Sequence, residues 1–211
     1  PWTAEVLAIA KEIHTKSQGI FNCGVGHRLV EAGLLPRHIG LADHSFGGIE
    51  DLRFIKPNLV QSKPPLCLDL GGIAKGYAVD KAVEILLANN IQSGSVNAGG
   101  DMRVFGNLTQ DIQIRNPSKP HELIQIGKMK VGAIATSSLY FAKRDADAKS
   151  YIVNPRNHEH IEFSESYSVI ANECVYADAL TKVVSISGNA QHPCLSHFSA
   201  QAIKIPHAAT P

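Results

Sequence analysis

The strongest candidate for chemistry is a turn with two adjacent glycines that lies between side chains of opposite charge. Asp69 precedes Gly71 and Gly72, and Lys75 follows them where apolar residues begin to recur at helical spacing. The first N–H groups of a helix lack partners within it, so a glycine turn there suits a phosphate group. The spacing fits neither a Walker A loop nor the dinucleotide-binding fingerprint. For the glycine pair alone an ordinary tight connection is the alternative, but we expect Asp69, Gly72 and Lys75 to line one wall of a pocket.

The elements that must position this turn are predicted to be a strand over residues 66–70 and a helix over residues 73–87. Two prolines precede the strand, and they cannot sit inside a sheet. A second Gly-Gly pair is predicted to join two strands within residues 95–105. We predict further strands over residues 52–55, 59–61, 112–115, 123–126, 131–136 and 168–172, and further helices over 3–17, 27–35 and 175–187. Hairpins mixed with a few helices indicate an α+β fold.

The run from Asp69 to Asp80, Asp-Leu-Gly-Gly-Ile-Ala-Lys-Gly-Tyr-Ala-Val-Asp, resembles the signature of the ApbE family, the FAD:protein FMN transferases. Shorter stretches that resemble the family lie at residues 17–22, 97–101, 136–140, 151–155 and 177–182. The resemblance implies an ApbE-like α+β fold with mixed or antiparallel strand–turn units and a few packed helices. It also implies a single domain over residues 1–205, N-terminally incomplete relative to the family. We expect residues 206–211, which have no pattern, to form a frayed tail.

The resemblance also implies a reaction, in which FMN passes from FAD to a Thr or Ser of an acceptor protein and AMP is released. Such a transfer needs a metal to neutralise developing charge and a group to take the hydroxyl proton. Carried over one position at a time, the family's FAD contacts fall on Asp69, Gly72, Lys75 and Val153. Its Mg²⁺ ligands fall on Gly72, Asp178 and Thr181. The histidine that the family uses for proton transfer falls on Tyr151.

Three positions depart from the family pattern. Lys182 stands where the family has a threonine ligand, and an ammonium group has no lone pair for a cation. It can instead pair with Asp178, one helical turn earlier. Tyr151 stands at the histidine position, and a phenol keeps its proton at neutral pH. Asn154 replaces an aspartate of the family. These changes predict weak or absent magnesium binding and impaired transfer.

Two functions from different classes therefore remain open. The first is an FAD:protein FMN transferase with impaired activity, and the second is a catalytically degenerate flavin-binding or scaffold protein of the same family. A nucleotide-binding domain with other chemistry would require the long motif match to be accidental. No acceptor-type Ser/Thr-Gly-Ala-Ser/Thr motif occurs, so we do not expect the chain to be its own acceptor.

The composition of the 211 residues sets outer limits on function. With 20 basic and 19 acidic residues and no basic block, the chain does not indicate a nucleic-acid partner. Its apolar runs are too short for a membrane span. It begins with Pro1 rather than Met, which leaves open an upstream segment and any targeting signal in it. The resemblance implies a periplasmic or membrane-anchored lipoprotein, and no such signal is visible in this sequence.

Other histidines and cysteines form weaker candidates for a metal site. His158 and His160 are interpreted as a polar hairpin tip. His192, Cys194 and His197 have no fourth ligand nearby in sequence, and we interpret them as incidental. The cysteines are predicted to be free thiols, since none forms a C-x-x-C pair: Cys23, Cys67, Cys174 and Cys194.

Overall fold

The computed structural model describes residues 2–37, 45–139 and 149–207. Its α-helices are α1 (Trp2–Lys16), α2 (Gly26–Glu31), α3 (Ala74–Ala88) and α4 (Cys174–Ser187). Three short 3₁₀ helices are η1 (Cys23–Val25), η2 (Ile49–Asp51) and η3 (Pro193–Phe198). The strands are β1 (Arg53–Lys56), β2 (Leu59–Gln61), β3 (Gly94–Ala98), β4 (Asp101–Phe105), β5 (Gln110–Arg115), β6 (Leu123–Met129), β7 (Gly132–Ser138), β8 (Ser166–Ala171) and β9 (Gln201–Ile205).

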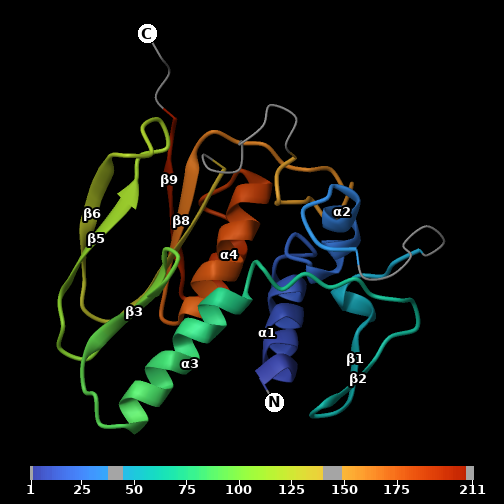
Figure 1. Ribbon diagram of the computed structural model, residues 1–211, viewed down its shortest axis with the longest axis horizontal. Helices are drawn as coiled ribbons and strands as arrows, with labels where there is room; N and C mark the ends of the chain where they lie inside the picture. Colours follow the sequence, from blue (N-terminus) through green and yellow to red (C-terminus); the bar gives the residue numbers. More distant parts are fainter. Residues whose placement is uncertain (1, 38–44, 140–148, 208–211) are drawn as a thin grey trace.

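An antiparallel sheet of five strands, in the order β3-β4-β7-β8-β9, forms the centre of the fold. Two separate hairpins, β1–β2 and β5–β6, complete the strand arrangement. Helices α3 and α4 pack against each other and against the sheet, and α1 contacts α4. Figure 1 shows the β5–β6 hairpin on one side of the helices and the β1–β2 hairpin on the other. The chain therefore has the α+β fold that its sequence predicts.

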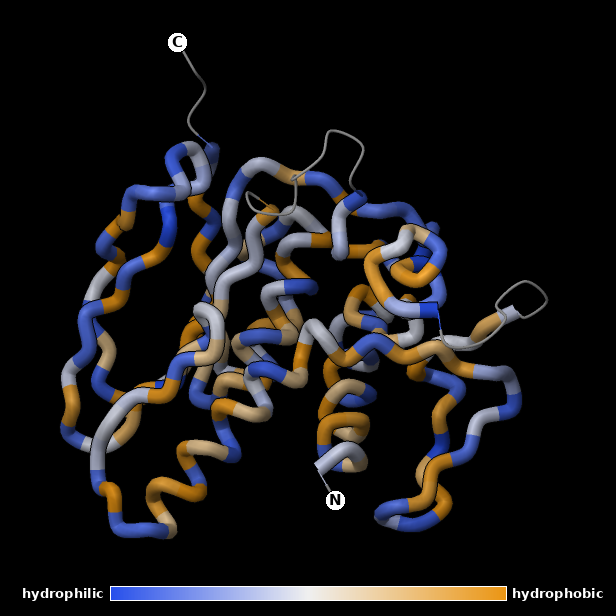
Figure 2. The backbone as a smooth tube through the Cα atoms, in the orientation of Figure 1, coloured by the Kyte–Doolittle hydropathy of each residue, from blue (hydrophilic) through white to orange (hydrophobic). Residues whose placement is uncertain are grey.

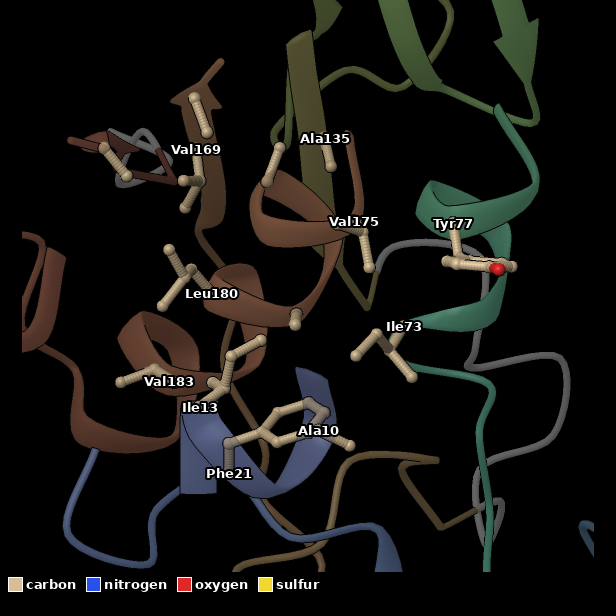
Figure 3. Packing of buried hydrophobic residues seen from close by; sticks show 14 of the residues in the cluster. Ala10, Ile13, Phe21, Ile73, Tyr77, Ala135, Val169, Val175, Leu180 and Val183 are labelled. Atoms are coloured by element: carbon tan, nitrogen blue, oxygen red, sulfur yellow. The ribbon is translucent and has the colours of Figure 1, made fainter. Parts of the chain in front are cut away.

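Alternation along β7 and β8 divides the core into two clusters, because successive side chains of a strand point to opposite faces. Ala133 and Ala135 of β7 and Val169 of β8 belong to the larger cluster, which includes the helices. Ile134 of β7 belongs to the smaller cluster, which lies between the sheet and the β5–β6 hairpin. Figure 3 shows the larger cluster, with side chains from α1, α4 and the sheet meeting beside Ile73. The start of α3 is thus packed against the main core.

Most predicted elements agree with the structure, and one strand does not. Leu66 makes only an isolated bridge to Gly47, and the rest of the segment 66–70 is extended without a strand partner. Its backbone bonds instead to the 3₁₀ helix η1: the N–H of Asp69 donates to the carbonyl of Cys23 at 2.8 Å. Helix α2 ends at Glu31 rather than at residue 35, and β9 and η3 were not predicted at all. The tail predicted over 206–211 lies mostly outside the described residues.

No helix among the described residues is long and apolar enough to cross a membrane. The longest helices, α1 and α3, have 15 residues each. Figure 2 shows that hydrophobic positions along both are interrupted by hydrophilic ones. This pattern is typical of helices that bury one face in a core.

Asp80 of α3 caps the N-terminus of α4 across the helix–helix interface. Its Oδ1 accepts the N–H of Cys174 at 2.9 Å, and its Oδ2 accepts the N–H of Val175 at 2.8 Å. The guanidinium of Arg103 donates to the same carboxylate at 2.7 Å. Glu173, the local N-cap residue, makes no side-chain cap bond, so the cap comes from a residue distant in sequence. This cap fixes the register between α3 and α4.

We expect Asp80→Ala to lower the free energy of unfolding by about 2 kcal/mol, because two helix N–H groups and a guanidinium lose their partner. Urea denaturation measures the change. Asp111→Ala is the matched control, because the carboxylate of Asp111 is exposed in the β5–β6 hairpin, and we expect a change within about 0.5 kcal/mol. Equal midpoints for the two variants would contradict the capping role.

Candidate functional site

A cavity of about 370 Å³ opens at the N-terminal end of α3. Figure 1 shows that α3 begins beside α4, and residues of both helices reach the cavity. A volume of this size is typical of small-molecule sites. The lining comes from residues 20–25, from α2 and the turn after it, from the glycine turn and the start of α3, from β7, from the segment after residue 150 and from α4. It includes the apolar Leu29, Leu34 and Leu35 together with Phe21, Asn22, Asp69, Gly71, Gly72, Lys75, Thr136, Ser137, Tyr151, Val153 and Lys182.

The glycine turn holds the residues that the sequence singled out on one wall of this cavity. Asp69, Gly72 and Lys75 all line it. Several N–H groups near the helix start already have partners in the protein: the N–H of Gly71 donates to Asp69 Oδ1 at 2.9 Å, and that of Gly76 donates to Asp178 Oδ2 at 3.1 Å. Charged side chains must therefore contribute more to anion binding, and backbone N–H groups less, than the sequence predicted.

Lys75 provides the first positive charge of the site. Its ammonium forms an ion pair with Asp101, and its side chain stays half exposed. Burial alone would lower the pKa of Lys75, but the carboxylates of Asp178 and Asp101 outweigh this and raise it. Burial and the negative charge of Asp178 raise the pKa of Asp101. Asp101 was not among the predicted site residues, although its place directly after a Gly-Gly turn was a visible signal.

Lys182 provides the second positive charge and lies among the residues expected to bind a metal. Its Nζ is 3.0 Å from Asp178 Oδ1 and 3.0 Å from Thr181 Oγ1. Its alkyl chain lies against Gly72, where a β-carbon would come within 3.1 Å of Lys182 Cε. The Asp178 side chain is fully buried and that of Lys182 is only 18% exposed. The predicted ion pair between Lys182 and Asp178 is confirmed, but it is a buried pair rather than a pair on the helix surface.

The contacts of Asp178 and Thr181 do not fit a magnesium ion. The Thr181 hydroxyl donates to the Asp178 carbonyl at 2.6 Å, so its two lone pairs remain as acceptors. Those face Lys182 Nζ at 3.0 Å and the Ser137 hydroxyl at 2.7 Å. Both carboxylate oxygens of Asp178 are also engaged, by Lys182 and by Gly76. Among the described residues no group of three or more His, Cys, Asp or Glu side chains could hold a metal.

The segment after residue 150 forms another wall. Val153 is buried, lines the cavity and makes a bridge to His160. The Tyr151 hydroxyl donates to the carbonyl of Ser138 at 2.7 Å, and the ring lines the cavity. The Asn154 side chain bonds to the backbone two residues later, where its Oδ1 accepts the N–H of Arg156 at 3.0 Å.

The weaker metal candidates His158, His160 and His192 make contacts within the protein. His158 makes an edge contact with the ring of His27 at 5.3 Å between centroids. His160 lies 2.5 Å from the carbonyl of Ser150, and His192 Nδ1 accepts the N–H of Cys194 at 3.3 Å at the start of η3. All four cysteines are free, as predicted. Burial raises the pKa of the Cys194 thiol to about 11, which keeps it unreactive at neutral pH.

Comparison with known proteins identifies relatives of this chain. A family model described as the ApbE family matches residues 1–203. An FAD:protein FMN transferase of Rhodobacter capsulatus is 26% identical over 208 residues, which cover 92% of this chain and 40% of that protein. An FAD:protein FMN transferase of Vibrio cholerae is 31% identical over 159 residues, which cover 70% of this chain and 46% of that protein. The chain thus spans less than half the length of these relatives.

Solved structures show the same arrangement of helices and strands. The ApbE protein of Thermotoga maritima superposes with a TM-score of 0.79 at 25% identity, covering 96% of this chain and 72% of that one. The flavin transferase ApbE of Vibrio cholerae superposes with a TM-score of 0.80 at 24% identity, covering 99% of this chain and 72% of that one. Because the Vibrio cholerae structure is only 24% identical, its similarity to this chain establishes the fold alone.

Proposed function

The chain belongs to the ApbE family, and from this premise we propose that it binds FAD in the cavity at the start of α3 and transfers FMN to an acceptor protein. In the proposed reaction a Thr or Ser hydroxyl of the acceptor attacks the phosphorus on the FMN side. The diphosphate bond breaks, AMP leaves with the bridging oxygen, and the hydroxyl proton passes to solvent. The acceptor is a second protein of unidentified sequence.

One observation supports this proposal most directly: the same cavity is lined by all four positions expected to contact FAD, one of which is a lysine, and by a second lysine. Asp69, Gly72 and Val153 line it together with Lys75 and Lys182. Positively charged side chains stabilise the charge that develops on the oxygens during phosphoryl transfer. The lysines are held in place by carboxylates, so little reorganisation is needed when a diphosphate enters.

Proton removal and metal binding are the two parts of the proposed reaction for which this chain lacks the residues that the family pattern places there. Tyr151 occupies the position at which the family places a histidine, and a phenol is a poor proton acceptor at neutral pH. Magnesium, which the family resemblance implies, is proposed to bind weakly because Lys182 occupies its expected ligands. We therefore propose slow transfer. The contacts of Lys182 with Asp178 and Thr181 equally favour the alternative function, which is flavin binding without transfer.

The two functions are separated by incubating the protein with FAD, with and without Mg²⁺, and an acceptor protein that carries a Ser/Thr flavinylation motif. Chromatography detects AMP, and fluorescence of the denatured acceptor detects covalent flavin. AMP and labelled acceptor in equal amounts support the transferase. Bound FAD with neither product supports a flavin-binding protein, and no bound flavin contradicts both.

A further inference from the structure

We propose that the ammonium group of Lys182 takes the place of a divalent cation in this site, so that the chain binds the diphosphate of a flavin dinucleotide without metal. This inference rests on the proposed function for the identity of the ligand. It does not rest on it for the exclusion of the metal, which follows from the contacts of Lys182 alone.

The position of the ammonium supports a ligand-binding role rather than a structural one. A lysine that pairs with a carboxylate one turn earlier normally does so on the exposed face of a helix, for a gain of a few tenths of a kcal/mol. The pair here lies beneath the glycine turn at the wall of the cavity, with Asp178 fully buried. Among the described residues, two of the three N–H groups of Lys182 reach acceptors, namely Asp178 Oδ1 and Thr181 Oγ1. The third is available to an oxygen of a bound diphosphate.

The charges around the cavity give a second, independent argument. Two lysines, Lys75 and Lys182, interact with two aspartates, Asp101 and Asp178, so the charges of these four side chains cancel. Asp69 adds one further negative charge to the lining. A magnesium ion would have to enter beside an ammonium that already holds the oxygens it needs, and like charges at such distances repel strongly. Replacing Lys182 by threonine leaves one net negative charge among these four positions, frees Asp178 Oδ1 and one lone pair of Thr181 Oγ1, and adds a hydroxyl oxygen as a further ligand. That variant then has the donors and the charge that a hard divalent cation prefers.

The inference is tested by measuring FAD affinity from flavin fluorescence in excess EDTA and in excess Mg²⁺. For the unmodified protein we expect Kd values that agree within about twofold, because the cation is built in. For Lys182→Thr we expect affinity about tenfold weaker in EDTA, as expected from loss of a charged hydrogen bond, and recovery in Mg²⁺. For Lys182→Met we expect the same loss without recovery, since the thioether offers magnesium no oxygen.

Three controls distinguish the effect of losing the Lys182 charge from the effect of damage to the fold. Lys81→Thr removes a lysine that pairs with Glu84 of α3 and with Glu5 of α1 and does not line the cavity, and it should leave FAD affinity unchanged in both buffers. Riboflavin has no phosphate, so its affinity should be insensitive to the Lys182 changes. Magnesium titration without flavin, followed by calorimetry, should give no isotherm for the unmodified protein and a measurable one for Lys182→Thr.

A tenfold or greater rise in the FAD affinity of the unmodified protein on adding Mg²⁺ would overturn the inference and leave the proposed function standing. So would equal FAD affinities for Lys182→Thr and the unmodified protein in EDTA. Absence of flavin binding in both buffers would overturn the proposed function and the diphosphate role together. In that case the magnesium titration still decides whether Lys182 excludes the metal.

Discussion

Restoring the family pattern by Tyr151→His, Asn154→Asp and Lys182→Thr together is expected to raise the rate of FMN transfer in Mg²⁺ by about 10²–10⁴-fold. General base catalysis alone typically contributes a factor of about this size. The Tyr151 hydroxyl donates to the Ser138 carbonyl, so the present side chain has its proton engaged and offers no strong acceptor for another. Removal of the Lys182 ammonium frees Asp178 and Thr181 for a metal. Single-turnover assays with labelled acceptor measure the rate.

The three changes should act together rather than additively, because metal and base serve the same step. Lys182→Thr alone supplies a metal site without a base, and Tyr151→His alone supplies a base beside an ammonium. We expect each single variant to gain less than a tenth of the combined effect. FAD affinity and thermal stability measured for every variant separate a change in chemistry from a change in binding or folding. An unmodified protein that already matches the rate of the triple variant would show that Tyr151 and Lys182 do not limit transfer.

Local signals in the sequence predicted the parts of the fold that depend on local interactions. The helix α3 and the β3–β4 hairpin were found because each follows or contains a glycine pair with clear periodicity on both sides. The strand predicted at 66–70 was wrong because a segment becomes a strand only beside another strand, and the neighbour to which this segment bonds is the 3₁₀ helix η1. β9 was missed because it is a short edge strand whose pairing with β8 depends on long-range packing.

The same distinction between local and long-range interactions explains which residues of the candidate site could be predicted from the sequence. Asp69, Gly72 and Lys75 lie within one motif, and the structure places all three in the lining of one cavity. The roles of Asp101 and Asp80 depend on contacts between elements far apart in sequence, such as the bonds from Asp80 to the first N–H groups of α4. The pairing of Lys182 with Asp178 follows from helix geometry, but its burial depends on α4 lying beneath the glycine turn and the sheet.

Gly76→Ala is expected to lower the free energy of unfolding by about 3 kcal/mol, although alanine is the better helix former. Gly76 lies where α3 crosses α4, and a β-carbon there would come within 2.3 Å of the Cys174 carbonyl oxygen and 2.8 Å of Asp178 Cβ. Neither neighbour is a flexible side-chain end, so the helices must separate, and overpacking of this kind typically costs about 1–3 kcal/mol or more. In an open helix the same change would instead stabilise by roughly 0.5–1 kcal/mol. The clash therefore dominates, and urea denaturation measures the net loss.

The displacement should also reach the site, because the N–H of Gly76 holds Asp178 Oδ2 and Asp178 holds Lys182. We therefore expect the folded fraction of Gly76→Ala to bind FAD more weakly than the unmodified protein. Gly72→Ala is the matched control: its β-carbon meets only the flexible alkyl chain of Lys182, at 3.1 Å, so its stability should change by less than about 1 kcal/mol. If Gly76→Ala unfolded at the same urea concentration as Gly72→Ala, the close crossing of α3 and α4 would not be what requires glycine at this position. The positioning of Asp178 would then have to depend on its other contacts.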